Sequence, residues 1–160
     1  YQLTGFYEKL VDRNVDTHSD VKTFEVIKAD VKLAETLNIR PDDKVWHVKR
    51  VRFIKQKPVN LEETWMPLAM FADLTWEVME NSKYHYIEQI KKMVIDRSEQ
   101  ELVPIMPSQE AIDALALDPA KPILEKVSRG FLKDGRVFEY SRNVFNSDDY
   151  KFTLVAKRRH

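Results

Sequence analysis

Two arginines placed two positions apart, Arg50 and Arg52, lie in a strand-like part of the sequence and could bind one anion together. Side chains alternate between the two faces of a strand, so residues separated by two positions point to the same side. Guanidinium groups on one side can converge on a phosphate or a carboxylate. The expected hairpin brings Glu62 opposite Arg50, where a carboxylate could accept hydrogen bonds from sugar hydroxyls. The alternative is a solvated sheet face with a weak Arg50–Glu62 ion pair.

Two further groups of residues could add to such a site. Ser82 stands at the start of a predicted helix, whose positive end attracts phosphate; a simple helix cap is the alternative. A second hairpin brings polar residues to one face, with Arg129 opposite Glu139, although the same pattern fits an ordinary polar strand. The residues expected on that face are Glu139, Ser141, Asn143 and Phe145.

Catalytic and metal sites have little support in the sequence. There is no cysteine, and none of the four histidines has the spacing of a zinc site. Glu62 and Glu63 are neighbours on a strand and therefore point to opposite faces, which argues against an acid–base pair. We therefore expect no catalytic residue, no metal and no cofactor.

The length indicates one domain, and the order of the predicted helices and hairpin-linked strands indicates an α+β class with an antiparallel sheet. The chain has 160 residues, and its 26 basic residues balance its 26 acidic ones. Zero net charge argues against direct nucleic-acid binding, the lack of cysteine favours the cytoplasm, and no apolar run is long enough to span a membrane. The basic run 157–160 is typical of a solvated tail.

We predict helices at 6–13, 31–37, 82–92 and 110–115, and strands at 21–31, 44–54, 58–66, 93–103, 123–132, 137–145 and 152–156.

The register of the first hairpin decides which face carries the arginines. A three-residue turn at 55–57 would pair Arg50 with Glu62 and Ile54 with Pro58, and would need a left-handed backbone at Lys57. A two-residue turn would reverse every partner. In the preferred register the core face contains Val51, Phe53, Val59, Leu61 and Trp65, and the opposite face contains Arg50, Arg52, Asn60, Glu62 and Thr64.

An internal repeat divides the sequence. The stretch 37–59 resembles the stretch 115–137 at an offset of about 78 residues, with Pro41 matching Pro119 and Phe53 matching Phe131. Each copy is a helix, a proline-containing turn and a hairpin. Two copies predict a sheet with approximate two-fold symmetry.

The sequence resembles the UTRA domain, the effector-binding part of HutC-subfamily GntR transcription regulators. The resemblance covers residues 1–160 and rests on the runs 46–52, 58–63 and 134–141. Within this family it is most similar to the trehalose-operon repressors of Gram-positive bacteria. The resemblance implies a chorismate-lyase-like fold with a mostly antiparallel sheet, a homodimer, and a separate N-terminal winged helix-turn-helix domain that contacts operator DNA and lies outside this chain.

The resemblance also implies a ligand and a set of contacts. The ligand would be a phosphorylated sugar, with trehalose 6-phosphate as the expected effector. Arg50 and Arg52 would hold the phosphate, and Glu62 would hold the sugar. The other implied contacts are Ser82, Tyr84, Glu139 and Phe145, where Phe145 stands in place of the family's tyrosine.

Two other functions remain open at this point. A chorismate-lyase-like enzyme could use the arginines to bind the carboxylates of a small substrate. A dimerisation domain without a ligand would need no buried site.

Overall fold

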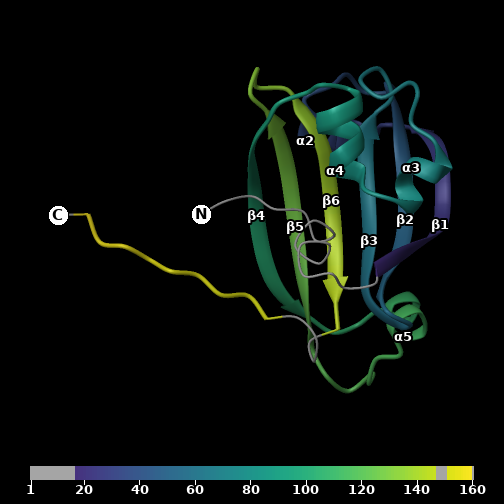
Figure 1. Cartoon of the computed structure of the whole chain (residues 1–160), viewed down its shortest axis with the longest axis vertical. Helices are drawn as coiled ribbons and strands as arrows, with labels where there is room; N and C mark the ends of the chain where they lie inside the picture. Colours follow the sequence, from purple (N-terminus) through teal and green to yellow (C-terminus); the bar gives the residue numbers. More distant parts are fainter. Residues whose placement is uncertain (1–16, 147–150, 160) are drawn as a thin grey trace.

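A single antiparallel sheet forms the centre of the molecule (Figure 1). The computed structural model describes residues 17–146 and 151–159. In these ranges every strand is antiparallel to its neighbours, and the sheet has the order β1-β2-β3-β6-β5-β4. The predicted α+β class with an antiparallel sheet is therefore confirmed. The strands are β1 (Thr17–Lys28), β2 (Lys44–Ile54), β3 (Lys57–Pro67), β4 (Ile95–Ile105), β5 (Ile123–Leu132) and β6 (Val137–Phe145).

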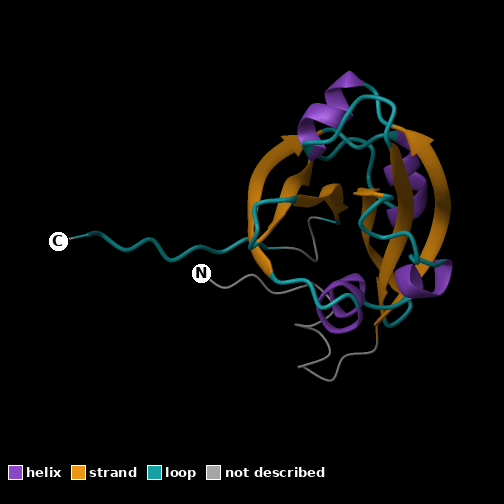
Figure 2. Ribbon diagram, turned by 90° about the horizontal axis from the view of Figure 1, so that it is seen from above, coloured by secondary structure: helices purple, strands orange, loops and turns teal. Residues whose placement is uncertain are grey.

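Short helices lie on both sides of this sheet (Figures 1 and 2). The predicted helix at 82–92 is divided into one turn of α-helix and a following π-helix. The predicted helix at 6–13 lies outside the described residues. The predicted strand at 152–156 is wrong, because residues 151–159 are exposed and form no regular structure. The described helices are α2 (Val31–Leu37), α3 (Trp76–Glu80), α4 (Lys83–His85), η1 (Tyr86–Ile90) and α5 (Gln109–Leu115).

The two halves repeat each other closely, as the sequence predicts. Helices α2 and α5 are capped in the same way, because Asp30 accepts a hydrogen bond from the third following amide and Ser108 does the same. Both helices end at a residue in the left-handed conformation, Asn38 and Ala116, each with φ of 53°. The strand order places β3 beside β6, so the approximate two-fold axis passes between these two strands.

The first hairpin keeps the predicted pairing at the arginines but not at its turn. Arg50 lies opposite Glu62 and Arg52 opposite Asn60, as predicted. The predicted Ile54–Pro58 pair is wrong, because Ile54 lies opposite Lys57. The turn has two residues, with Lys55 at φ of 56°. It is one residue shorter than predicted, but a β-bulge at the register shift between Arg52 and Phe53 adds one residue to the hairpin. The two differences cancel, so the predicted pairing is kept from Arg52 onward.

A similar irregularity changes the second hairpin. The register shifts between Gly130 and Phe131, so that Gly130 lies opposite Glu139 and Arg129 lies opposite Tyr140. The predicted Arg129–Glu139 pair is therefore wrong, and Arg129 belongs to the other face of the sheet. One extra residue in a strand is enough to move the side chains that follow it to the opposite face of the sheet.

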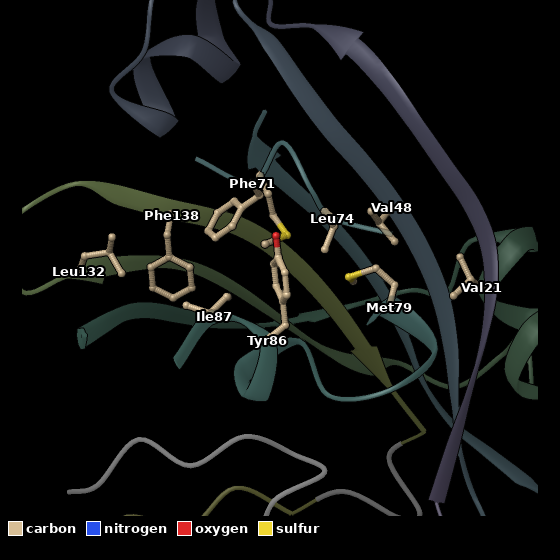
Figure 3. Close-up of a cluster of buried hydrophobic side chains, with 10 residues drawn as sticks. Val21, Val48, Phe71, Leu74, Met79, Tyr86, Ile87, Leu132 and Phe138 are labelled. Carbon is tan, nitrogen blue, oxygen red and sulfur yellow. The ribbon is translucent and has the colours of Figure 1, made fainter. Parts of the chain in front are cut away.

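Each face of the sheet carries its own buried apolar cluster. The cluster in Figure 3 packs the segment 68–90 against one face, and α2 packs against the opposite face with a second cluster. On the predicted core face Val51 and Val59 are buried, but Phe53, Leu61 and Trp65 are only partly covered. The face that carries the arginines is not solvated. Its side chains are as deeply buried as the core.

We predict that Gly130→Ala destabilises the fold through a steric contact. A Cβ atom at this position would lie 2.6 Å from Cζ of Phe138, whose ring is fully buried. Crowding in a packed core costs about 1–3 kcal/mol, which urea denaturation would measure. Adding Phe138→Leu shortens the opposing side chain, so the double variant should lose less than the sum of the two single losses. Simple additivity would show that the contact is not the cause.

Candidate functional site

Buried polar side chains gather on the sheet face that the segment 76–90 covers. They come from the inward positions of strands β2, β3, β5 and β6 and from α4, and we call this group the polar interior. Burial of so many polar groups is uncommon unless they are paired or serve a ligand. The group contains Arg50, Arg52, Asn60, Glu62, Thr64, Lys83, Ser128, Glu139, Ser141 and Asn143, all with less than 9% of their surface exposed.

A continuous chain of charged contacts runs through the centre of the polar interior. The Nε atom of Arg50 donates to Glu62, and Nζ of Lys83 lies 2.9 Å from the other oxygen of the same carboxylate. Lys83 also lies 2.6 Å from Oε2 of Glu139, and the hydroxyl of Tyr84 donates to Oε1 of Glu139 over 3.1 Å. Lys83 thus joins a carboxylate of the first half to a carboxylate of the second.

Arg50 also fixes the segment that covers the site. Its Nη1 atom donates to the backbone oxygens of Met79, at 2.7 Å, and Asn81, at 3.2 Å. These carbonyls lie at the end of α3, where helical carbonyls lack partners of their own. The side chain of Met79 enters the apolar cluster of Figure 3. The covering segment is therefore held by apolar packing and by the same guanidinium that pairs with Glu62.

The surrounding cations keep Glu62 ionised. Burial by itself would raise the pKa of this carboxyl, but the neighbouring positive charges outweigh burial. Arg50 contributes most, followed by Lys83 and Arg52, and the hydrogen bond from Arg50 adds to them. The pKa of Glu62 is consequently held well below its ordinary value.

The same environment favours the uncharged form of two other groups. Burial, together with the charge of Glu139 and the hydrogen bond to it, raises the pKa of the Tyr84 hydroxyl well above its ordinary value, so this group remains a donor. Burial lowers the pKa of Lys126, and the charge of Arg52 contributes to that decrease, whereas Glu62 opposes it. Lys126 therefore belongs to the same electrostatic group.

Basic side chains outnumber acidic ones in this group. Arg50, Arg52, Lys83 and Lys126 are four basic residues, and Glu62 and Glu139 are two acidic ones. Guanidinium and ammonium groups gathered in this way can bind an added anion.

The two halves of the repeat carry different residues at equivalent inward positions. The approximate two-fold axis relates the Arg50–Glu62 pair to the cross-strand pair Ser128–Ser141. The two serine hydroxyls lie 2.8 Å apart, and the amide of Asn143 donates to Ser141 over 3.4 Å. At these positions the first half therefore has a charged pair, and the second has neutral hydrogen-bonding groups suited to hydroxyls.

The predicted site residues are only partly connected. Arg50, Glu62, Glu139 and Tyr84 are linked by hydrogen bonds and ion pairs through Lys83, and Arg52 lies beside them opposite Asn60. Ser82 and Phe145 lie apart from this chain. The hydroxyl of Ser82 caps α4 by accepting from the amide of His85 over 3.1 Å. Phe145 is buried at the end of β6, with Nζ of Lys126 5.6 Å from its ring centre.

Sequence reasoning missed two lysines, Lys83 and Lys126. The position of Lys83 gave no signal, because a lysine in the first turn of a surface helix is normally solvated. Lys126 could have been found from strand alternation, since it shares a face with Ser128. The predicted register lacked the bulge at Gly130, so Arg129 was expected on this face instead.

In residues 17–146 and 151–159, no three or more His, Asp and Glu side chains gather in a way that could hold a metal ion. None of the helices described there is both long and apolar enough to cross a membrane.

Comparison with known proteins gives a consistent result. The UTRA domain family model matches residues 12–151. The mannosyl-D-glycerate transport/metabolism system repressor MngR of Escherichia coli is 69% identical over 159 residues, which cover 99% of this chain and 66% of that protein. The chain spans about two thirds of the length of the curated relatives that it matches.

Two other relatives bear on the fold and on the expected ligand. The crystal structure of the possible transcriptional regulator YydK from Bacillus subtilis superposes with a TM-score of 0.84 at 29% identity, over 89% of this chain and 62% of that one. The chorismate-lyase-like α+β fold is thereby confirmed. TreR of B. subtilis is 26% identical over 98% of this chain and 66% of its own length. The expected preference for the trehalose-operon repressors is therefore wrong, because MngR is far more similar.

We predict that Lys83→Met strongly destabilises the fold. The substitution keeps the apolar volume but leaves the buried carboxylates of Glu62 and Glu139 without their shared cation. Removing one partner of a buried ion pair costs about 3–5 kcal/mol, which chemical denaturation would detect. Lys22→Met is the matched control, because the Lys22–Asp20 pair is exposed and should contribute less than about 1 kcal/mol. Equal losses in the two variants would contradict the bridging role of Lys83.

Glu62 should also give the fold a distinct acid sensitivity. Its pKa is lower in the folded chain than the ordinary value of 4.5, so its stabilisation is complete above pH 4.5 and is lost as the pH falls toward the folded value. Below pH 4.5 the free energy of unfolding should therefore fall more steeply in the natural chain than in Glu62→Gln, by up to about 1.4 kcal/mol per pH unit. The exposed Glu35→Gln control should keep the natural slope, and a Glu62→Gln slope that matches it would exclude this role for Glu62.

Proposed function

The chain belongs to the UTRA domain family, and from this we propose that it is the effector-binding domain of a GntR-type transcriptional repressor. The curated relatives are named as repressors and regulators, which supports binding rather than catalysis. In this proposal operator DNA is contacted by a domain outside this chain, and the protein acts in the cytoplasm. The equal numbers of acidic and basic residues support an indirect connection of this domain to DNA.

The single observation that carries the ligand proposal is the cluster of basic side chains in the polar interior. An effector with an anionic group could bind to this cluster. Arg52 and Lys126 supply charge to such an anion, and Arg50 contributes while it holds Glu62 and the segment 76–90. A phosphate or a carboxylate meets this requirement, because guanidinium groups bind both.

The neutral side chains of the polar interior favour a hydroxylated ligand. Hydroxyl and amide groups at Ser128, Ser141 and Asn143 can each donate and accept hydrogen bonds. The carboxylates of Glu62 and Glu139 add acceptors beside them. A sugar that carries an acidic group matches both the neutral and the basic side chains. In this proposal Phe145 provides an apolar surface for the sugar ring, and Ser82 and Tyr84 support the ligand from α4.

Among acidic sugars, we favour a ligand of the mannosyl-D-glycerate class. MngR, which is 69% identical, takes its name from mannosyl-D-glycerate, and TreR is only 26% identical. The glycerate group carries a carboxylate, and phosphorylation of the mannose would add a second anionic group for the clustered basic side chains. Trehalose 6-phosphate has the phosphate but no carboxylate, so it serves as the comparison ligand.

The covering segment provides a route from ligand to DNA affinity. Arg50, Lys83 and Tyr84 connect the segment 76–90 to both halves of the sheet. An anion that competes with Glu62 or Glu139 for these groups changes how the segment is held. A ligand changes DNA binding only if it prefers one arrangement of the whole protein over another.

We predict that mannosyl-D-glycerate or its phosphorylated form binds in calorimetry, whereas mannose and trehalose do not. Arg52→Met should weaken that binding by about 10- to 100-fold, because hydrogen bonds to charged groups contribute about 1.5–3 kcal/mol. The matched control is Arg129→Met, since Arg129 lies on the other face and pairs with Glu99 at 2.9 Å.

The outcomes separate the class of function from the identity of the ligand. Binding of trehalose 6-phosphate alone would replace the ligand and keep the anionic-sugar class. Equal affinity for neutral and acidic sugars, or equal losses in Arg52→Met and Arg129→Met, would contradict the role of the buried positive charge.

A further inference from the structure

Lys126 lies beside the polar interior without a carboxylate partner. Its side chain is partly exposed, and Nζ lies 5.6 Å from the ring centre of Phe145. Nζ of Lys83, by contrast, forms ion pairs with Glu62 and Glu139. Within residues 17–146 and 151–159, no carboxylate forms an ion pair or a hydrogen bond with Nζ of Lys126. An ammonium group that is largely removed from water and has no such partner is less favoured than the neutral amine.

The strand register brings this amine close to the row of residues that carries Arg52. Phe145 lies opposite Asn60 across β6 and β3, and Asn60 lies opposite Arg52 across β3 and β2. Lys126 belongs to the neighbouring row, which leads through β6 to Glu62. Residues directly opposite each other in a sheet share a face. The amine and the guanidinium of Arg52 therefore face the same interior.

The charges around Lys126 act on its protonation. Burial lowers the pKa of the amine, and Glu62 and Glu139 only partly oppose this effect. The charges of Arg52 and Lys83 add to the decrease. Burial and neighbouring cations favour the neutral form of a lysine, and that form is a nucleophile. The polar interior thus places a nucleophilic amine beside groups that bind anions.

We propose that Lys126 is acylated by acyl phosphates whose phosphate group is held at Arg52. In an acyl phosphate a single oxygen atom joins the phosphorus to the acyl carbon. A guanidinium that holds the phosphate therefore brings an electrophilic carbon to the side of the site where the amine lies. The inference rests on the anion site of the proposed function, and it adds a covalent modification to that site.

The acyl transfer needs no further reactant. The lone pair of Nζ attacks the acyl carbon and forms a C–N bond. The bond from the acyl carbon to the bridging oxygen then breaks, and phosphate leaves with the electron pair. One proton of the amine passes to the released phosphate, so the products are an amide of Lys126 and hydrogen phosphate.

The modification would reduce the response to an anionic effector. The free amine can take up a proton when an anion binds and then supplies positive charge to it. The amide cannot, because acylation removes the basic group. Acylation of Lys126 therefore weakens effector binding without changing the fold of the sheet.

Incubation of the chain with acetyl phosphate, followed by peptide mass spectrometry, tests the modification. Lys126 should be acetylated about tenfold faster than Lys121, an exposed lysine just before the same strand. Excess inorganic phosphate should protect Lys126 and leave Lys121 unchanged, and this comparison needs no variant. An equal or slower reaction at Lys126, or equal protection of the two lysines, would overturn the proposal.

Variants then test whether the anion site directs the reaction. Arg52→Met should remove the preference for Lys126 with acetyl phosphate, whereas Arg129→Met, on the other face, should keep it. Acetic anhydride has no phosphate group, so its relative reaction at Lys126 and Lys121 should be the same in the natural chain and in Arg52→Met. A preference for Lys126 that survives in Arg52→Met with acetyl phosphate would contradict the directing role.

Calorimetry separates this inference from the proposed function. Treatment with acetyl phosphate should weaken binding of the acidic sugar to the natural chain by about tenfold, because a charged partner is lost. The same treatment should leave the affinity of Lys126→Arg unchanged. Sugar binding that depends on Arg52, without preferential acetylation of Lys126, would overturn this inference and leave the proposed function in place. Phosphate-sensitive acetylation of Lys126 without sugar binding would support the inference and contradict the sugar ligand.

Discussion

The ammonium group of Lys83 between two buried carboxylates is the interaction on which the polar interior depends. Glu62 belongs to the first half of the repeat and Glu139 to the second, so this one cation holds together side chains that are 77 positions apart in the sequence. Buried carboxylates remain ionised only when opposite charge compensates for lost hydration. The covering segment 76–90, which supplies Lys83, is consequently part of the electrostatics of the site as well as a cover for it.

The repeat provides the framework, and divergence between its halves provides the chemistry. Two similar units place two hairpins on either side of one axis, and the same inward positions carry Arg50 and Glu62 in one unit and Ser128 and Ser141 in the other. A symmetric set of residues would bind a symmetric ligand best. The observed set has charged side chains from both halves and a neutral serine pair in the second, which suits a molecule that has both an acidic group and hydroxyls.

Much of the fold and part of the polar interior could be predicted from the sequence. Strand alternation and the repeat correctly gave the antiparallel sheet, the pairing of Arg50 with Glu62, and the shared face of Glu139 and Ser141. Three features escaped prediction. The bulge at Gly130 depends on packing against Phe138, the burial of Lys83 depends on where a short helix docks, and the burial of both sheet faces depends on the loop and helices that cover them.

The central claim is that the buried cluster of basic side chains binds the acidic end of a sugar-containing effector. A crystal structure of the chain grown with mannosyl-D-glycerate, natural or phosphorylated, tests it most directly. The account predicts the acidic group of the ligand within hydrogen-bonding distance of Arg52 or Lys126, and the sugar toward Ser128 and Ser141. A ligand bound elsewhere on the chain, or one whose acidic group points to solvent while neutral groups contact Arg52, would contradict it.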